Sequence, residues 1–249
     1  MVVNFYKNCD FEISESVLVE LLKIYEEKEA LPSGRGTSKL IEYKGKNYIL
    51  KKESRGGLFS SFLPRDFFRL QSFFKEVEIS KVMEKEGLTI PIFLRFGLKH
   101  NILWKIYTLT PYIVECLSLK DIALKDNLER EKVFLAGKII AKMHKIGIFH
   151  SDLNLGNIIF DRDKAFLIDF KNSYIYDSPL NKTLSKKNIL RVLRSYLKET
   201  ARVKKELNKD FLKALLDGYS SENKEDWANK ISFDTFSIKL HALTYKIRF

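Results

Sequence analysis

Two clusters of polar residues in the second half of the chain have the residue types and spacing of a phosphoryl-transfer site. The first reads His-Ser-Asp-Leu-Asn-Leu-Gly-Asn at residues 150–157, and Asp169, in an Ile-Asp-Phe run, comes twelve residues after Asn157. A carboxylate such as Asp152 can accept the proton of a hydroxyl group as its oxygen attacks phosphorus. An amide oxygen and a second carboxylate suit Mg²⁺ bound to nucleotide phosphates. The pattern therefore predicts Asp152 as the base and Asn157 and Asp169 as metal ligands.

The spacing of the two clusters has a mechanical explanation. Residues 158–160 and 165–168 read as two strands around the polar turn 161–164. Because a hairpin brings its outer ends together, Asn157 and Asp169 are expected to face each other. The alternative is a polar surface loop beside an ordinary hairpin, and the joint presence of both clusters behind a long amphipathic helix favours the site.

Length and composition set the limits of the interpretation. The 249 residues, 45% hydrophobic and 13% aromatic, are enough for one large or two small folded domains. Cys9 and Cys116 form neither a Cys-x-x-Cys motif nor part of a metal cluster, which fits a reducing compartment. The first residues, with Asp10 and Glu12, predict no signal peptide, and no apolar run approaches the roughly 18 residues needed to span a bilayer.

The net charge of +12 has several explanations. Nucleic acid, an anionic membrane surface and phosphorylated substrates all suit a basic protein, and so does a merely lysine-rich solvated surface. No aromatic and basic recognition motif for nucleic acid accompanies the charge, so we expect no nucleic-acid partner.

The first half of the chain offers candidate nucleotide-binding residues. A helix at 16–28 precedes a loop with Gly34, Arg35 and Gly36, where backbone N–H groups can approach phosphate oxygens, although a plain turn is the alternative. Strands at 40–43 and 48–51 follow, around a turn at 44–47. Ile49 and Lys51 share one face of the second strand, which places Ile49 against adenine and Lys51 near the phosphates. Lys52 competes with Lys51 for this role.

The next segments complete the first half. A helix at 73–86, ending at Gly87, carries Glu76 and Glu78, one of which is expected to pair with Lys51. Strands at 93–98 and 102–109 form a hairpin over 99–101. We place the domain boundary after residue 110, giving domains 1–110 and 111–249, with backbone groups of Pro111 and Ile113 offered to adenine.

The second half reads as mostly helical. Helices are expected from 119, at 129–145 with Gly147 after its end, at 184–198, at 211–219 and at 224–231, whereas 236–249 has no assignment. His144 reads as a packing residue at a helix end. The basic residues of the 184–198 helix are expected to line its outside: Lys186, Lys187, Arg191, Arg194 and Lys198.

The segment 58–74 combines six phenylalanines with Arg65 and Arg69, and Arg55 lies just upstream. Aromatic and basic residues together suit an anionic lipid surface. The alternative is that the phenylalanines belong to the core, and the two interpretations stay open.

In these features the chain resembles a known family, the lipopolysaccharide-core kinases, and most closely the Kdo (3-deoxy-D-manno-octulosonic acid) kinases within the protein-kinase-like superfamily. The resemblance covers about residues 34–200. It is carried by six runs: Gly34-Arg35-Gly36, Arg55-Gly56-Gly57-Leu58, residues 75–91 ending in Gly-Leu-Thr-Ile-Pro, the cluster at 150–158, Ile168-Asp169-Phe170, and residues 188–195.

The resemblance implies an α+β, protein-kinase-like fold of two lobes, with a sheet and one main helix in the first and mostly helices in the second. It implies ATP and Mg²⁺ as cofactors and transfer of a phosphoryl group to a Kdo hydroxyl on a lipid A precursor. The enzyme would act peripherally at the cytoplasmic face of the inner membrane. Register favours Glu76 over Glu78 as the partner of Lys51. Two positions depart from protein kinases: Lys171 replaces the glycine after Asp-Phe, and Asn154 replaces the catalytic-loop lysine.

These expectations assign each candidate residue a role. Asp152 is the base, and Asn154 steadies the loop or the incoming phosphoryl group. Arg55, Arg65 and Arg69 are candidates for the carboxylate and phosphates of the substrate. The alternatives are a kinase for heptose or a small alcohol, and a kinase-like protein that binds nucleotide without chemistry.

Overall fold

The computed structural model describes residues 3–7, 14–31, 38–54, 70–223 and 231. Several predictions lie outside these residues: the Gly34–Gly36 phosphate loop, Arg55, Arg65 and Arg69, most of the segment 58–74, nearly all of the helix at 224–231, and residues 236–249. The chain divides into two compact units. Unit 1 comprises 1–81 and 90–114, and unit 2 comprises 82–89 and 115–249.

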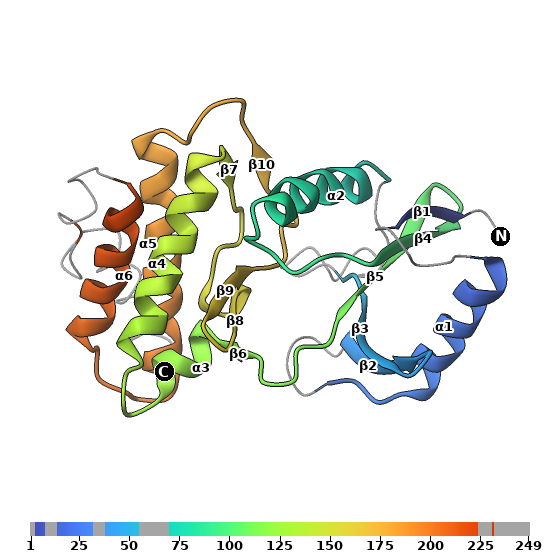
Figure 1. The fold of residues 1–249 in the computed structure, drawn as a ribbon, viewed down its shortest axis with the longest axis horizontal. Coiled ribbons are helices and arrows are strands. Elements are labelled where there is room, and N and C mark those ends of the chain that lie inside the picture. The colour runs from blue at the N-terminus through green and yellow to red at the C-terminus, as the bar shows by residue number, and fades with distance from the viewer. Residues whose placement is uncertain (1–2, 8–13, 32–37, 55–69, 224–230, 232–249) are drawn as a thin grey trace. The chain divides into compact units, whose positions relative to one another are not determined.

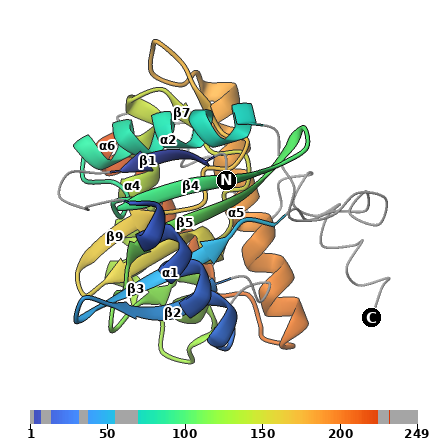
Figure 2. The same cartoon turned by 90° about the vertical axis from the view of Figure 1, so that its right-hand side faces the viewer.

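Unit 1 is built on a five-stranded antiparallel sheet in the order β1-β4-β5-β3-β2, which Figure 2 shows from one side. Its strands are β1 (Val3–Lys7), β2 (Ser38–Tyr43), β3 (Lys46–Lys52), β4 (Leu94–His100) and β5 (Leu103–Pro111). The predicted turn at 44–47 is shorter than expected. Lys44 has a φ of 49°, so the chain reverses over two residues and Tyr43 already pairs with Lys46. Strand β1 was not predicted.

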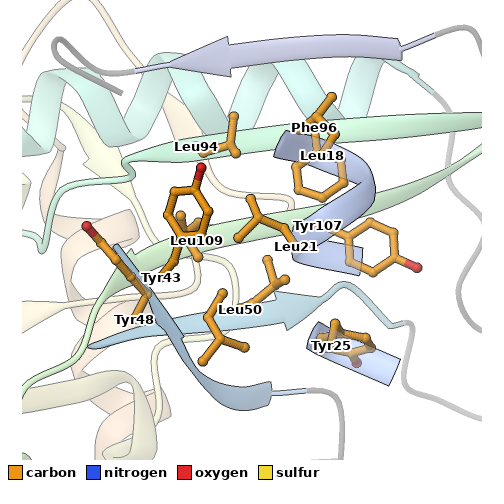
Figure 3. Packing of buried hydrophobic residues seen from close by; sticks show 11 residues of the cluster. Leu18, Leu21, Tyr25, Tyr43, Tyr48, Leu50, Leu94, Phe96, Tyr107 and Leu109 are labelled. Atoms are coloured by element: carbon orange, nitrogen blue, oxygen red, sulfur yellow. The ribbon is translucent and has the colours of Figure 1, made fainter. Parts of the chain in front are cut away.

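Helix α1 (Glu15–Glu27) covers one face of this sheet and so confirms the helix expected at 16–28. Ser14 caps it by accepting from the backbone N–H of Val17 at 3.3 Å. Leu18, Leu21 and Tyr25 of the helix pack against sheet residues such as Leu50 and Phe96 (Figure 3). Burial of these apolar side chains, at about 25 cal/mol per Å², holds the helix on the sheet.

The opposite face of the sheet meets helix α2 (Leu70–Lys85), which confirms the helix expected at 73–86. Val77 of α2 packs with Trp104 and Ile106 of β5. Because side chains alternate along a strand, Ile49 and Lys51 of β3 lie on the face away from Tyr48 and Leu50, as predicted. Residues 82–89, which include the last turn of α2, belong to unit 2.

Unit 2 is mostly helical. Its helices are α3 (Leu119–Leu124), α4 (Arg130–Lys145), α5 (Lys182–Arg202) and α6 (Lys209–Glu222), and a short 3₁₀ helix, η2, spans Leu155–Asn157. Helices α4 and α6 pack side by side (Figure 1). One apolar side of α4, formed by Val133, Ala136, Ile140 and Met143, is fully buried. In the described part of the chain, no helix has the length and apolar character to cross a bilayer.

Short strands frame the candidate catalytic segment. Strands β6 (Leu117–Ser118), β8 (Ile158–Asp161) and β9 (Lys164–Leu167) form one small sheet, and β7 (Ile148–Phe149) pairs with β10 (Tyr174–Ile175). The segment between Asp169 and α5 therefore contains a short strand. Gly147, just after the end of α4, contacts the segment that follows Asp169. Its φ is 76°, its carbonyl accepts from Tyr176 N–H at 2.9 Å, and a Cβ there would lie 2.3 Å from the Tyr176 carbonyl oxygen.

Candidate active site

The loop between β7 and β8 holds Asp152 by its backbone. The side-chain amides of Asn154 and Asn157 donate to the Asp152 carbonyl oxygen at 3.1 and 2.8 Å. Asn154 also accepts from Gly156 N–H at 2.8 Å, which caps η2. The Asp152 side chain itself is exposed. The geometry thus fixes the backbone of the predicted base while its carboxylate remains accessible.

His150 joins the two sequence clusters. Its ring is fully buried; Nδ1 accepts from Asp152 N–H at 3.2 Å, and Nε2 donates to the Ile168 carbonyl oxygen at 3.0 Å. Burial lowers the pKa of His150, so the ring is neutral in this tautomer. Both nitrogens are occupied, which makes His150 a support for the loop rather than a proton carrier.

The hairpin β8–β9 brings Asn157 and Asp169 to the same end, as predicted. Ile158 pairs with Leu167, and Ile168 N–H donates to the Asn157 carbonyl oxygen at 3.0 Å. Asp169 follows directly with a φ of 65°, a conformation that aspartate and asparagine adopt more readily than other side chains. The roles of these two residues as metal ligands stay a prediction.

The donor set at this end of the hairpin fits Mg²⁺. Asn157 uses its amide nitrogen to hold Asp152, so its oxygen is the atom that suits a cation, beside the Asp169 carboxylate. Among the described residues, no group of three or more His, Cys, Asp and Glu side chains is placed to hold a metal. Magnesium commonly takes one or two protein oxygens and completes its shell with water and substrate phosphates. Two oxygen donors are therefore a fitting but incomplete shell.

The residues after α2 support the same hairpin. Leu167 N–H donates to the Leu88 carbonyl oxygen at 2.9 Å, and the buried Thr89 hydroxyl donates to the Leu167 carbonyl oxygen at 2.6 Å. These bonds act two residues before Asp169. They give a physical role to the Gly-Leu-Thr-Ile-Pro run at 87–91, which sequence reading used only as a family mark.

Helix α5 holds the catalytic loop at two points. The buried Asn188 side chain accepts from His150 N–H at 3.2 Å and donates to the His150 carbonyl oxygen at 2.7 Å. About two helical turns after Asn188, Ser195 Oγ accepts a hydrogen bond from Leu155 N–H at 3.2 Å. Sequence reading missed both roles. The available signal was an asparagine one residue before Ile189, next to the buried apolar residues Ile189 and Val192.

Asn188 also continues a buried polar chain. Its Oδ1 lies 3.1 Å from His144 Nε2, and His144 Nδ1 lies 2.9 Å from the Tyr219 hydroxyl of α6. Burial lowers the pKa of His144 to about 4, although the Asn188 bond acts in the opposite direction. The interpretation of His144 as a packing residue is confirmed, because its side chain is buried and both ring nitrogens are bonded.

One prediction for α5 is partly wrong. Lys186, Lys187 and Lys198 are exposed, as expected, but Arg191 and Arg194 are partly buried. For Arg191 the reason is its position, within about 60° around the helix axis of both Asn188 and Ser195, which hold the catalytic loop.

In unit 1, Lys51 belongs to a row of side chains that crosses three strands. Lys51 of β3 pairs in register with Thr108 of β5, and Thr108 with Arg95 of β4. Lys51 Nζ lies 3.7 Å from a carboxylate oxygen of Glu53, the residue that follows β3. Arg95 donates to Thr108 Oγ1 at 3.0 Å and lies 3.8 Å from Glu53. The row therefore assembles charged groups around Lys51.

Helix α2 contributes Glu76 to this buried cluster. Its carboxylate accepts from Arg95 Nη2 at 2.7 Å, whereas Glu78 is exposed. Of the two glutamates Glu76 is the buried one, and its pairing with Lys51 stays a prediction. Sequence reading missed Glu53 and Arg95. The signal for Arg95 was a charged residue directly between Leu94 and Phe96 in a predicted strand.

Pro111 and Ile113 lie at the end of β5 and just after it. Pro111 pairs with Tyr48, and Ile113 is partly buried. Nothing in their geometry distinguishes an adenine-binding role, which stays a prediction together with that of Ile49.

The model of the lipopolysaccharide kinase (Kdo/WaaP) family matches residues 22–219. A 3-deoxy-D-manno-octulosonic acid kinase of Vibrio vulnificus (strain CMCP6) is 31% identical over 200 residues, 76% of this chain and 82% of that protein. A protein of the same name from Pasteurella multocida (strain Pm70) is 28% identical over 207 residues, with the same coverage.

Among solved structures, WaaP in complex with acyl carrier protein is similar over 98% of both chains, with a TM-score of 0.59 and 13% identity. At this identity the likeness concerns the fold alone. It confirms the expected α+β, protein-kinase-like fold.

Proposed function

Because the chain belongs to the lipopolysaccharide kinase (Kdo/WaaP) family, we propose that it transfers the γ-phosphoryl group of ATP to a hydroxyl of a Kdo sugar on a lipid A precursor. Family membership makes the protein a kinase, and the sugar and its lipid carrier are the proposed part. The acceptor rests on the relatives of 26–31% identity, which are named for 3-deoxy-D-manno-octulosonic acid.

The observation that carries the proposal is the fixed backbone of Asp152. Four bonds surround it: two side-chain amides on its carbonyl oxygen, His150 on its N–H, and Asn188 on the neighbouring His150 backbone. Such a loop holds an exposed carboxylate at one place, which a general base requires. Asp152 would accept the proton of the sugar hydroxyl as that oxygen attacks phosphorus.

Asn157 and Asp169 would hold Mg²⁺ on the nucleotide phosphates. When bound, the ion supplies positive charge that offsets the charge developing on the transferred phosphoryl group. Asp169 contributes the carboxylate and Asn157 the amide oxygen. Because Asn157 also holds the Asp152 carbonyl oxygen at 2.8 Å, it would couple the position of the base to that of the metal ligands.

Lys51 would neutralise the α- and β-phosphates. Its side chain is 32% exposed, at the end of a buried row whose two carboxylates, Glu53 and Glu76, flank Arg95. Two positive and two negative side chains thus offset one another, which lowers the free-energy cost of removing them from water. The arrangement leaves a lysine that is anchored on one side and open to an anion.

We further propose that the enzyme acts at the cytoplasmic face of the inner membrane, since a lipid-linked sugar is presented there. The segment 58–74, with its phenylalanines and Arg65 and Arg69, is the candidate for contact with anionic lipid. Release of the protein from anionic vesicles by high salt would support this; equal binding to neutral vesicles would contradict the electrostatic part.

The test of the function is transfer of label from [γ-³²P]ATP to three acceptors: a Kdo-bearing lipid A precursor, a heptose-bearing core and free Kdo. We expect labelling of the first, dependent on Mg²⁺ and lost in Asp152→Asn. Labelling of the heptose core alone would replace the proposed acceptor, and labelling of free Kdo at an equal rate would remove the lipid from recognition.

A further inference from the structure

Two arginines on α5 stand out among the charged residues of unit 2. Arg191 and Arg194 are one helical turn apart and partly buried. Within the described part of the chain, neither forms an ion pair with a carboxylate. Arg194 Nε donates to the Leu190 carbonyl oxygen at 3.0 Å, and Arg191 Nε is buried without a hydrogen-bond partner. Most donors of the two guanidinium groups thus have no hydrogen-bond acceptor among the described residues.

Arg95 of unit 1 differs from these two arginines in having carboxylate partners. Arg95, which is almost completely buried, meets two carboxylates, Glu53 at 3.8 Å and Glu76 at 2.7 Å. Burying a charge without a partner costs several kcal/mol in real proteins, so positive groups removed from water are normally neutralised. Arg191 and Arg194 are only partly buried, and in the described part of the chain no carboxylate neutralises them, so an anion from outside would supply the missing partner.

The position of the pair identifies where that anion would lie. Position 191 lies between Asn188 and Ser195 along the helix axis, and at about 100° per residue it is within about 60° of both around the axis. Asn188 holds the backbone of His150, and Ser195 holds that of Leu155. Arg191 therefore lies alongside the middle of the loop that carries Asp152.

Electrostatic effects agree with this placement. Burial lowers the pKa of His150, and the charge of Arg191 acts in the same direction. Burial also lowers the pKa of Arg194, again with a contribution from Arg191. The charge of Arg191 thus reaches both the catalytic loop and the second guanidinium group.

We propose that Arg191 and Arg194 form an anion subsite that binds an oxyanion of the acceptor beside Asp152. This inference rests on the proposed function. Two guanidinium groups suit a planar carboxylate or a tetrahedral phosphate. Because Asp152 receives the proton of the acceptor hydroxyl, we assign the subsite to the carboxylate of the same sugar acid. A phosphate of the lipid has the same chemistry and is separated from it by the test.

The test compares steady-state kinetics of Arg191→Gln, Arg194→Gln and the control Lys186→Gln, an exposed lysine of the same helix. A charged hydrogen bond contributes about 1.5–3 kcal/mol, so each arginine variant should lose about 10- to 100-fold in kcat/KM for the acceptor. The KM for ATP should stay the same. Lys186→Gln should behave as the parent protein. Acceptor kcat/KM within threefold of the parent in both arginine variants would overturn the proposal.

Chemically altered acceptors identify the anion. An acceptor with its sugar carboxylate reduced to an alcohol should be poor for the parent protein, and Arg191→Gln should lower its rate no further. An acceptor without lipid phosphates should still show the full loss in the variant. The reverse pattern would move the subsite to a lipid phosphate and contradict our assignment.

Two further measurements keep the proposal testable when activity or folding fails. Arg191→Lys keeps the charge but not the planar fork, so it should fold and lie between parent and glutamine variant. If the parent phosphorylates none of the acceptors, the proposed function fails. The subsite is then tested by NMR of the arginine Nε–H signals during titration with free Kdo and with its reduced alcohol. Shifts with the acid alone support it, and equal or absent shifts overturn it.

Discussion

The guanidinium group of Arg95 donates to the carboxylate of Glu76 at 2.7 Å, with both side chains almost completely buried. The bond connects strand β4 to helix α2, nineteen positions apart in the chain. It orients the glutamate that sequence reading selected as a partner for Lys51. The position of this glutamate thus depends on a second, unanticipated arginine.

Arg95→Met should destabilise the protein by about 3–5 kcal/mol, because it leaves Glu53 and Glu76 buried together without their shared cation. Urea denaturation measures the change. Lys99→Met, an exposed site on the same strand, should stay within about 0.5 kcal/mol of the parent. Additive effects of Arg95→Met and Glu76→Gln in a double-mutant cycle would show that the pair is not coupled.

Asp152→Asn should lower kcat at least about a hundredfold, because a general base acts in the transition state. The exposed side chain makes little contribution to packing, so melting temperature and nucleotide affinity should hardly change. Asp163→Asn, in the exposed hairpin turn, is the matched control. A variant with activity within a few-fold of the parent would remove Asp152 from the mechanism.

Asp169→Asn should remove the Mg²⁺ dependence of nucleotide binding, since the carboxylate charge that balances the ion is lost. Asparagine also tolerates a φ of 65°, so the fold should be kept. Calorimetric titration of ADP with and without Mg²⁺ measures the effect independently of catalysis. Overlapping titrations for variant and parent would contradict the metal assignment, and Asp177→Asn, at an exposed site, should retain the parent's response.

Substitutions in α5 should form a graded series. Asn188→Ala loses both bonds to the His150 backbone and the bond to His144, so we expect at least about 2 kcal/mol of lost stability and reduced kcat. Ser195→Ala loses one bond to Leu155 N–H, at about 1 kcal/mol. Chemical denaturation and kcat are measured together. Equal effects of the two substitutions would contradict the central role of Asn188.

Stability should fall as the pH drops from about 6.5 to about 4. Burial lowers the pKa of His144 from 6.5 to about 4, so the unfolded chain binds a proton in this range that the folded chain refuses. The stabilisation is complete above pH 6.5 and amounts to on the order of 3 kcal/mol. His150 acts in the same direction, so some pH dependence should persist in His144→Gln.

The melting temperature between pH 4 and 7 measures this effect for parent and His144→Gln. The curve of the variant should be flatter. NMR titration of the His144 ring in the parent protein provides the direct check, and a pKa near 6.5 for this ring would refute the explanation.

Local patterns accounted for most of the helices and longer strands. The β8–β9 hairpin, which brings Asn157 and Asp169 to one end, was predictable because its two strands and turn are contiguous. Strands β7 and β10 were not, since two-residue strands have no periodicity and their pairing joins Phe149 to Tyr174. Tertiary pairing decided these elements.

The candidate site divides in the same way. Asp152, Asn157 and Asp169 are recognisable because their chemistry lies in a short run of sequence. Glu53 and Arg95 act through partners on other strands and on α2, and a single-sequence pattern does not show which buried charges meet. Asn188 has its role only because α5 packs against the catalytic loop.

Gly147 has a consequence for aligning relatives of this chain. A side chain at this position is opposed twice, by the positive φ and by the carbonyl oxygens of Tyr176 and Ser178, 2.3 and 2.7 Å from where a Cβ would lie. These obstacles are backbone atoms, which a change of rotamer cannot move aside. Position 147 therefore reports on the backbone conformation nearby. A relative with any other residue there must have a different backbone conformation in the segment between Asp169 and α5.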